Sequence, residues 1–163
     1  MERNALIKLA LGLVMLGVAG SVLVRFWRSD RGASGKAFFY DVSLKKLFAA
    51  PIGSVPPIKG LDDDREDAVR AVVVSTNGNP ADKSSWMIAY LETYSPELKK
   101  QIEAARATGA APAMGRAGAQ MHRFVRRLTD AEWTPLVAPE ADQIVNGWLT
   151  AGPGGVPAVV CTP

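Results

Sequence analysis

The sequence predicts an α+β fold, in which an N-terminal transmembrane helix precedes a small antiparallel sheet with two packed helices. Three observations support this prediction. A long apolar run opens the chain, strand patterns come mostly in neighbouring pairs, and the helical patterns follow those pairs instead of alternating with them. Paired strands followed by helices are typical of α+β domains with antiparallel sheets, whereas strict alternation would favour a parallel sheet.

The apolar run, Ala5–Val24, has the length of a membrane span. Lys8 is its only charged residue, and about 20 helical residues, at roughly 1.5 Å each, cross the hydrocarbon core of a bilayer. Its leucines and valines lie on all sides of the helix, as in a helix surrounded by lipid. Phe26 and Trp27 follow among arginines, a composition typical of the membrane interface. We therefore expect residues 1–28 to be an anchor that contacts the lipid bilayer through Ala5–Val24.

The processing and orientation of this segment have alternatives. Val18 and Gly20 precede Ser21 as the small residues that signal peptidase accepts, so a cleaved signal peptide competes with an anchor. The apolar run continues through Val24, which favours the uncleaved anchor. Basic residues are more numerous after the span than before it, which favours a cytoplasmic domain. The free amino terminus adds a positive charge before the span and so reduces the difference in charge between its two ends. The sequence therefore does not decide on which side of the membrane the domain lies.

The excess positive charge of the chain belongs to the flanks of the apolar run. The whole chain has a net charge of +3. Residues 1–36 hold six basic and two acidic residues, a net charge of +4, and the remainder holds thirteen basic and fourteen acidic residues, a net charge of −1. A nucleic-acid interface needs a concentrated positive surface. Because the domain is nearly neutral, we expect no nucleic-acid partner.

The first part of the domain predicts a hairpin. Residues 29–36 are small and polar and predict a linker, and residues 37–163 predict the α+β domain. Two apolar runs, Ala37–Val42 and Leu47–Ala50, are expected to pair across a turn that lacks glycine and asparagine. Three prolines then keep the chain extended, and residues 62–67 are expected to form an acidic loop.

The middle of the domain has the strongest strand and helix signals. Val69–Ser75 is β-branched and nearly continuous, as expected of a central strand, and Trp86–Tyr94 is expected to return beside it. Ser95 and Pro96 open a helix as its N-cap and first residue, and Gly109 ends it. The helix is expected to pack on the sheet through one apolar stripe. That stripe consists of Leu98, Ile102 and Ala105.

The next stretch predicts a loop and an edge strand. Residues 109–120 are rich in glycine and alanine and are expected to be a mobile loop. A strand is expected over residues 123–128, with Phe124, Arg126 and Leu128 facing inward. Residues 129–132 then have a capping-box pattern that predicts one helical turn.

The C-terminal part predicts a second helix over residues 139–149 and a short last strand over residues 156–161. The helix begins at a proline and ends before a glycine-rich break, as helices commonly do. Its buried face is expected to consist of Ile144, Val145, Trp148 and Leu149.

One acidic segment alternates like a calcium loop. Asp62, Asp64 and Glu66 occupy positions one, three and five of such a loop. The glycine required at position six and the glutamate required at position twelve are missing, and Val73 occupies the latter position. We therefore expect a solvated loop and no metal site.

The remaining candidates for chemistry are single residues. His122 is the only histidine and Cys161 the only cysteine, so the sequence offers neither a histidine cluster nor an intrachain disulfide. Asp41 together with Asp82 or Glu92 would form a carboxylate pair of the kind that glycosidases use, but their spacing carries no signal for it. The sequence therefore assigns no catalytic, cofactor-binding or metal-ligating residue.

Several short motifs lie along the domain, and they occupy Tyr40-Asp41 with Leu47–Pro51, Pro56–Ile58, Val69–Val74, Tyr90–Glu97 and Trp133–Pro135. With these motifs the chain resembles a group of uncharacterised bacterial single-pass membrane proteins. The resemblance covers most of the chain and implies an N-terminal anchor, a small domain and a location in the bacterial membrane. Relatives often carry a cysteine pair after the central strand, where this chain has Ser75–Asn79. A cysteine-based metal or redox role is therefore not implied here.

These observations favour a non-enzymatic accessory or protein-interaction subunit at the membrane surface. Gly17 and Ser21, four residues apart in the apolar run, form a small-residue face that suits contact with another membrane protein. A membrane-tethered small hydrolase that uses carboxylates is one alternative. A pilin-like assembly subunit is another, although no Gly-Phe processing site precedes the apolar run.

Overall fold

A computed structural model describes residues 35–62, 64–149 and 155–163 of the chain. The expected anchor, Ala5–Val24, and most of the expected linker lie outside these residues. Within the described part, no helix combines the length and apolarity needed to cross a membrane. Residues Gly35–Pro163 form one compact unit, and the architecture below is that of this unit.

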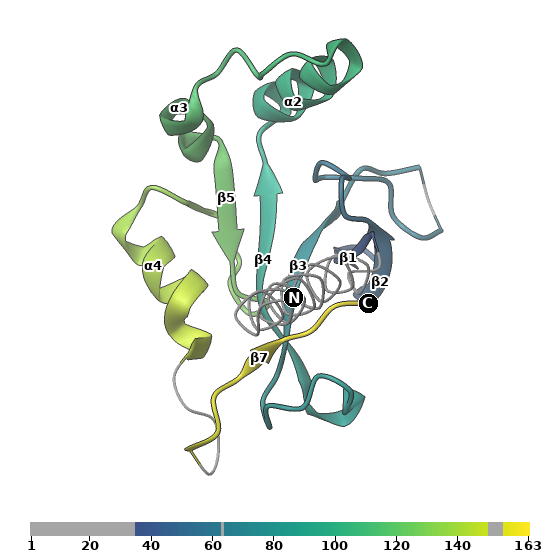
Figure 1. The fold of residues 1–163 in the computed structure, drawn as a ribbon, viewed down its shortest axis with the longest axis vertical. Helices are drawn as coiled ribbons and strands as arrows, with labels where there is room; N and C mark the ends of the chain where they lie inside the picture. Colours follow the sequence, from purple (N-terminus) through teal and green to yellow (C-terminus); the bar gives the residue numbers. More distant parts are fainter. Residues whose placement is uncertain (1–34, 63, 150–154) are drawn as a thin grey trace, which may run out of the picture. The chain divides into compact units, whose positions relative to one another are not determined.

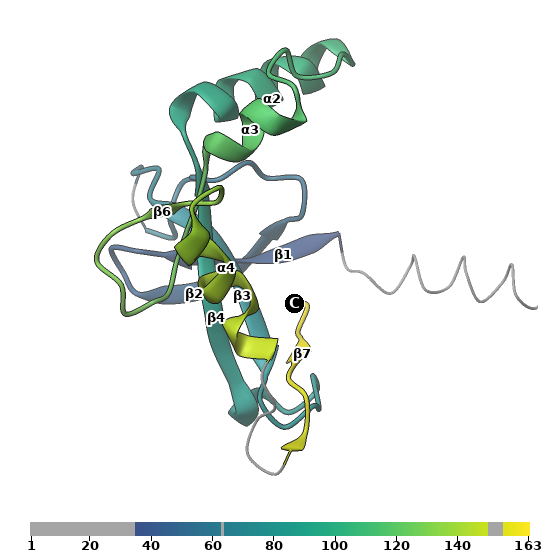
Figure 2. The same ribbon diagram turned by 90° about the vertical axis from the view of Figure 1, so that its left-hand side faces the viewer.

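The unit is built on a seven-stranded antiparallel sheet, with the order β2-β1-β3-β4-β5-β6 and with β7 paired to β3. Figure 1 labels all of these strands except β6, which is labelled in Figure 2. This topology confirms the α+β class and the antiparallel sheet. The strands are β1 Lys36–Asp41, β2 Lys46–Pro51, β3 Ala68–Ser75, β4 Trp86–Tyr94, β5 Arg123–Arg126, β6 Thr134–Pro135 and β7 Val159–Val160.

Two hairpins form where the sequence predicts them. β1 pairs with β2 so that Tyr40 faces Leu47, and Lys45 has a positive φ of 55° in a turn that contains no glycine. β3 and β4 form the central pair, and the turn between them contains Gly78, with a φ of 75°. A side chain at Gly78 would also lie 2.8 Å from Val156, so this turn requires glycine for both its backbone conformation and its packing.

β3 has one edge covered by two different strands. β1 pairs with its first three residues, Ala68–Arg70, and β7 pairs with Val74 and Ser75. β4 occupies the other edge of β3, so β1 and β7 must share the remaining one. The amide of Cys161 continues the β7 pairing with a 2.8 Å hydrogen bond to the carbonyl of Val73. The expected last strand is therefore confirmed, in a shorter form.

The longest helix, α2, spans Pro96–Thr108 and has both expected ends. The Ser95 hydroxyl accepts a 3.2 Å hydrogen bond from the Leu98 amide, and Gly109 closes the helix with a φ of 68°. Leu98 and Ala105 of the expected apolar stripe are buried. The helix lies beyond the end of β4, however, instead of across the face of the sheet (Figures 1 and 2).

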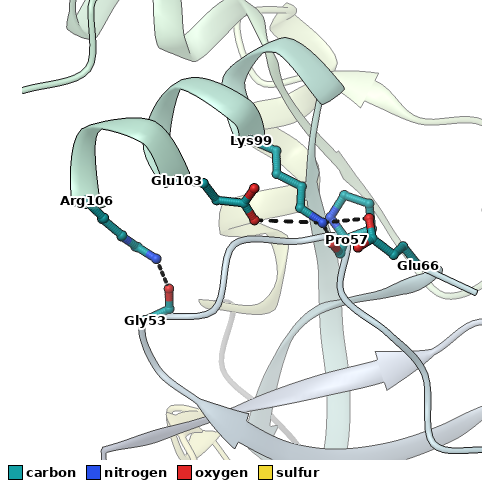
Figure 3. Close-up of polar contacts among 6 residues, drawn as sticks. All are labelled: Gly53, Pro57, Glu66, Lys99, Glu103 and Arg106. Atoms are coloured by element: carbon teal, nitrogen blue, oxygen red, sulfur yellow. Dashed lines mark hydrogen bonds and ion pairs between the residues drawn. The ribbon is translucent and has the colours of Figure 1, made fainter. Parts of the chain in front are cut away.

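Polar contacts connect α2 to the chain between β2 and β3 (Figure 3). The Lys99 ammonium donates a 2.6 Å hydrogen bond to the Pro57 carbonyl and forms a 2.7 Å ion pair with Glu66. About two turns further along, the Arg106 guanidinium donates to the Gly53 carbonyl. These contacts place the helix over that loop, so the expected packing on the sheet is corrected to packing at its end.

A second helix in this region, α3, spans Arg116–Met121. Part of the expected mobile loop, residues 109–120, is therefore helical. The glycines and alanines that suggested a loop permit this short helix, because alanine has the highest helix propensity of all residues. The loop proper is limited to residues 109–115.

The C-terminal helix, α4, spans Pro139–Asn146 and continues as a 3₁₀ turn, η2, over Gly147–Leu149. Ile144 is buried as expected, but Leu149 is 56% exposed, and the buried Ala141 takes its place in the core. The 3₁₀ turn explains the difference, because three residues per turn rotate the last side chains away from the face that a continuous α-helix would present.

The expected facing of strand β5 was wrong. The strand ends at Arg126, Leu128 is 47% exposed, and Val125 is almost completely buried. Val125 packs with α4, whereas Arg126 turns to the other face, with its guanidinium carbon 4.6 Å from the centroid of the Trp133 ring. Both faces of β5 are covered, so the assumption of a single inward face does not hold.

The expected helical turn at residues 129–132 is also absent from the structure. The Asp130 carboxylate accepts a 3.0 Å hydrogen bond from the Arg127 amide, which closes a turn before the capping box can form. β6 follows this turn and pairs with β5.

Candidate functional site: the groove between α2 and α3

A groove of about 540 Å³ lies between α2 and α3, at the end of the sheet where β4 finishes and β5 begins. Both helices adjoin this end of the sheet in Figures 1 and 2. The lining is largely apolar. It consists of Leu98 and Ile102 from α2, Ala111, Pro112, Met114 and Gly115 from the loop, Arg116 and Ala119 from α3, and Tyr94 and Arg123 from the sheet.

The sheet contributes a charged pair beneath this groove. Tyr94 lies opposite Arg123 in the β4–β5 register, and strand alternation places Glu92 on the same face. The Arg123 Nε donates a 2.8 Å hydrogen bond to the Glu92 Oε1, and Nη2 donates to the same oxygen. Glu92 is only 6% exposed. Two charge-assisted hydrogen bonds therefore compensate a carboxylate that is removed from water.

The charge of Glu92 changes the pKa of two neighbouring groups, Arg123 and Tyr94. Burial alone would lower the pKa of Arg123, but the neighbouring Glu92 outweighs burial, and the pKa is raised. Burial raises the pKa of Tyr94, and the negative charge of Glu92 raises it further. The Arg123 guanidinium lies 5.7 Å from the centroid of the Tyr94 ring. At neutral pH the floor of the groove thus holds an internally balanced ion pair beside a neutral phenol.

Arg116 differs from Arg123 in having no partner among the residues that the structure describes. Its side chain is exposed, it lines the groove, and it forms no hydrogen bond or ion pair with any residue that the structure describes. No carboxylate belongs to the part of the lining that the described residues form. The groove therefore combines an apolar wall with one guanidinium whose charge is not balanced by the surrounding lining.

Met114 closes the loop side of the groove. Its amide donates a 2.8 Å hydrogen bond to the Gln101 side chain of α2. Its own side chain lies over Gly118 of α3, where an added Cβ would come within 2.9 Å of the Met114 Cγ. The absence of a side chain at position 118 thus allows the loop to approach α3 closely.

The only histidine connects α2 to the start of β5. The His122 Nδ1 and the Ser95 hydroxyl are 2.9 Å apart, and the Ser95 amide donates a 2.8 Å hydrogen bond to the His122 carbonyl. The same hydroxyl caps α2, so the contact has a structural explanation. Cys161 is far away. Its amide donates a hydrogen bond to the carbonyl of Val73, and Val73 is paired with Ile88 on β4. Ile88 lies seven residues before Ser95, and a strand of seven residues spans about 20 Å.

The sequence suggested a catalytic pair of Asp41 with either Asp82 or Glu92. In the structure these three carboxylates lie in three separate hydrogen-bond networks. Asp41 accepts from the amides of Leu44 and Leu61, at 2.8 Å each. Asp82 caps the 3₁₀ turn η1, Lys83–Ser85, and Glu92 binds Arg123. The structure does not unite them in a single site.

Two carboxylates of the acidic loop at residues 62–67 form ion pairs with lysines. Asp64 and Lys59 form an ion pair at 2.7 Å, and Glu66 pairs with Lys99 of α2 at the same distance. Nowhere in the described ranges do three residues of the metal-ligating types gather closely enough to hold an ion. Through Glu66, this loop forms an ion pair with α2.

The buried carboxylate of Asp41 makes the stability of the fold depend on pH. Its side chain is 0% exposed, and the amides of Leu44 and Leu61 lower its pKa from the ordinary value of 3.8 despite the opposing effect of burial. A depressed pKa in the folded state stabilises the fold above the unfolded pKa, and this stabilisation is lost as the pH falls through the folded pKa.

We therefore expect Asp41→Asn to lower the Tm of the full chain in detergent by roughly 5 °C at pH 7. The difference from the wild type should shrink as the pH falls below about 4, and thermal unfolding at a series of pH values measures it. The exposed Asp62, changed to Asn, is the matched control and should leave Tm unchanged. A Tm difference for Asp41→Asn that is constant from pH 7 to pH 3 would contradict the explanation.

The sequence pointed to some of these residues but not to their grouping. Alternation along β4 could have placed Glu92 and Tyr94 on one face, next to a strand that begins with Arg123. The groove itself has no signal in the sequence, because it depends on how α2 and α3 meet at the end of the sheet.

The fold and the groove define an α+β domain with an antiparallel sheet and an apolar groove that carries two guanidiniums. Comparison of the chain with protein-family models, curated proteins and solved structures finds no match. The resemblance to bacterial single-pass membrane proteins therefore remains a prediction from the sequence.

Proposed function

We propose that this chain is a single-pass membrane-anchored accessory or interaction protein whose domain binds a partner without chemical conversion. The observation that carries the proposal is the composition of the groove. Its lining offers apolar side chains, a phenol and two guanidiniums, which are groups that bind and orient. Residues raised as candidates for chemistry, His122 and the three carboxylates, have structural bonding partners instead.

The anchor supports the other part of the proposal. Ala5–Val24 has the length and composition of a membrane span, and Gly17 and Ser21 offer a face for another membrane helix. A carboxylate-based hydrolase receives less support, because Asp41, Asp82 and Glu92 lie in separate networks. A pilin-like assembly gains no specific support from the described residues.

Photo-crosslinking in intact cells tests the proposal. A photoreactive residue at Ala113, in the exposed loop beside the groove, should give a discrete crosslinked product. The same residue at the exposed Asp142 of α4, remote from the groove lining, is the matched control and should give none. Equal products at both positions, or a monomer without any crosslink after mild detergent extraction, would count against an interaction protein.

Protease accessibility tests the topology in the same preparation. The loop at residues 110–115 is exposed except for Met114, so it is the expected cleavage site. Cleavage in inverted vesicles but not in intact cells would establish a cytoplasmic domain. Cleavage in both would contradict the membrane-spanning anchor, because the domain would then not be confined to one side.

A further inference from the structure

We propose that the groove between α2 and α3 is a binding site for a small apolar molecule that carries a single carboxylate. The apolar body would lie against Ile102, Met114 and Ala119, and the carboxylate would bind the guanidinium of Arg116. This inference rests on the proposed binding role of the groove and names the class of its ligand, a small molecule whose binding does not depend on the anchor.

The first argument is charge complementarity. Arg123 is already neutralised by Glu92 through two hydrogen bonds, whereas Arg116 has no partner among the described residues. A ligand with one negative charge would therefore balance the site. A guanidinium binds carboxylates through paired, charge-assisted hydrogen bonds. A phosphate monoester carries close to two charges at neutral pH, and one guanidinium would leave part of that charge unbalanced in apolar surroundings.

The second argument is size. A volume of about 540 Å³ falls within the range of roughly 300 to 1,000 Å³ that is typical of small-molecule sites. The wall formed by α3 has only six residues, which corresponds to about 9 Å of helix. That length suits a short acyl chain better than a helix of a protein partner, which needs several turns of contact.

The third argument is the way the groove is closed. Two hydrogen bonds connect the loop to α2: the Met114 amide donates to the Gln101 side chain, and the Ala110 amide donates to the Ala105 carbonyl. The Met114 side chain lies between the loop and α3, and methionine adapts its shape readily to apolar ligands. The loop side of the groove can therefore adjust to the occupant while the sheet and α2 keep their positions.

The test uses the full chain in lipid nanodiscs, with octanoate as the probe and 1-octanol as its uncharged counterpart. Titration calorimetry, corrected with empty nanodiscs, should show saturable binding of octanoate and much weaker binding of octanol. Hydrogen exchange in the presence of octanoate should show protection at residues 98–102 and 114–119, which locates the site.

Matched variants separate the charge from the apolar wall. Arg116→Gln should weaken octanoate binding by about tenfold or more, as expected for the loss of a charge-assisted hydrogen bond. Lys100→Gln removes an exposed positive charge of α2 that does not line the groove, and it should bind like the wild type. Ala119→Phe should abolish binding of both probes by filling the groove.

The assignment would be overturned by equal affinities of the wild type and Arg116→Gln, by equal binding of octanol and octanoate, or by protection elsewhere in the chain. Binding of an apolar peptide with a free C-terminal carboxylate, without binding of octanoate, would overturn it in favour of a protein partner. Loss of octanoate binding with intact crosslinking at Ala113 would leave the interaction role standing and remove only the small-molecule site.

Discussion

Changing Phe39 to alanine should lower the free energy of unfolding by about 4 kcal/mol, which is typical of removing a buried phenylalanine. Phe39 is 0% exposed, and its ring centroid lies 6.2 Å from that of Phe48 and 5.8 Å from the Arg70 guanidinium carbon. The substitution removes apolar surface from the core and also deprives Arg70 of the ring on which it stacks. Both losses occur at the junction of β1, β2 and β3, so we expect them to weaken the whole edge of the sheet.

Denaturant unfolding of the full chain in detergent measures this effect. Phe39→Leu keeps most of the volume and should cost less than half as much. Leu128→Ala provides a second control, because Leu128 is 47% exposed and its truncation should cost less than about 1 kcal/mol. A larger loss for Leu128→Ala than for Phe39→Ala would contradict the observed core and restore the facing of β5 that the sequence predicted.

Changing Arg123 to methionine should lower the free energy of unfolding by about 3 kcal/mol, because Glu92 would remain buried without its partner. The expected value is at the low end for buried pairs, since the Arg123 side chain is 36% exposed and water can reach the site. Glu92 accepts two hydrogen bonds from Arg123 and its side chain is only 8% exposed. The cost therefore arises mainly from the desolvated carboxylate that is left behind.

A double-mutant cycle tests that reason. Glu92→Leu combined with Arg123→Met replaces both charges by apolar groups of similar size, and it should recover most of the lost free energy. Strict additivity of the two single changes would show that the pair does not interact. The same variants also test which arginine binds the ligand in the groove. If the destabilised Arg123 variant still binds octanoate, the carboxylate of the ligand binds Arg116.

Sequence patterns predicted those elements whose signals are local. The Ser95 cap, Pro96 and Gly109 specify both ends of α2 through contacts within a few residues of each other. The continuous β-branched run of β3 likewise requires only that the strand be buried on both faces. These features appear in the structure as expected, because backbone conformation and burial of a single segment determine them.

The features that the sequence did not predict depend on contacts between distant segments. The position of α2 beyond the sheet is determined by Lys99 and Arg106, which bind carbonyls some forty to fifty residues earlier in the chain. The facing of β5 depends on two different covers, α4 on one side and Trp133 on the other. The groove arises from the same distant contacts, so its lining residues share no spacing that a pattern could reveal.

The shared edge of β3 turns the only cysteine of the chain into a reporter of local opening. Cys161 is 4% exposed, and it is held there by the two-residue strand β7 and by the hydrogen bond from its amide to the Val73 carbonyl. Burial also raises the pKa of its thiol, so a reagent that attacks thiolates reacts slowly while the strand is paired. Release of so short a strand requires far less free energy than global unfolding. The rate of thiol labelling thus measures how often the last strand leaves the sheet while the rest of the domain stays folded.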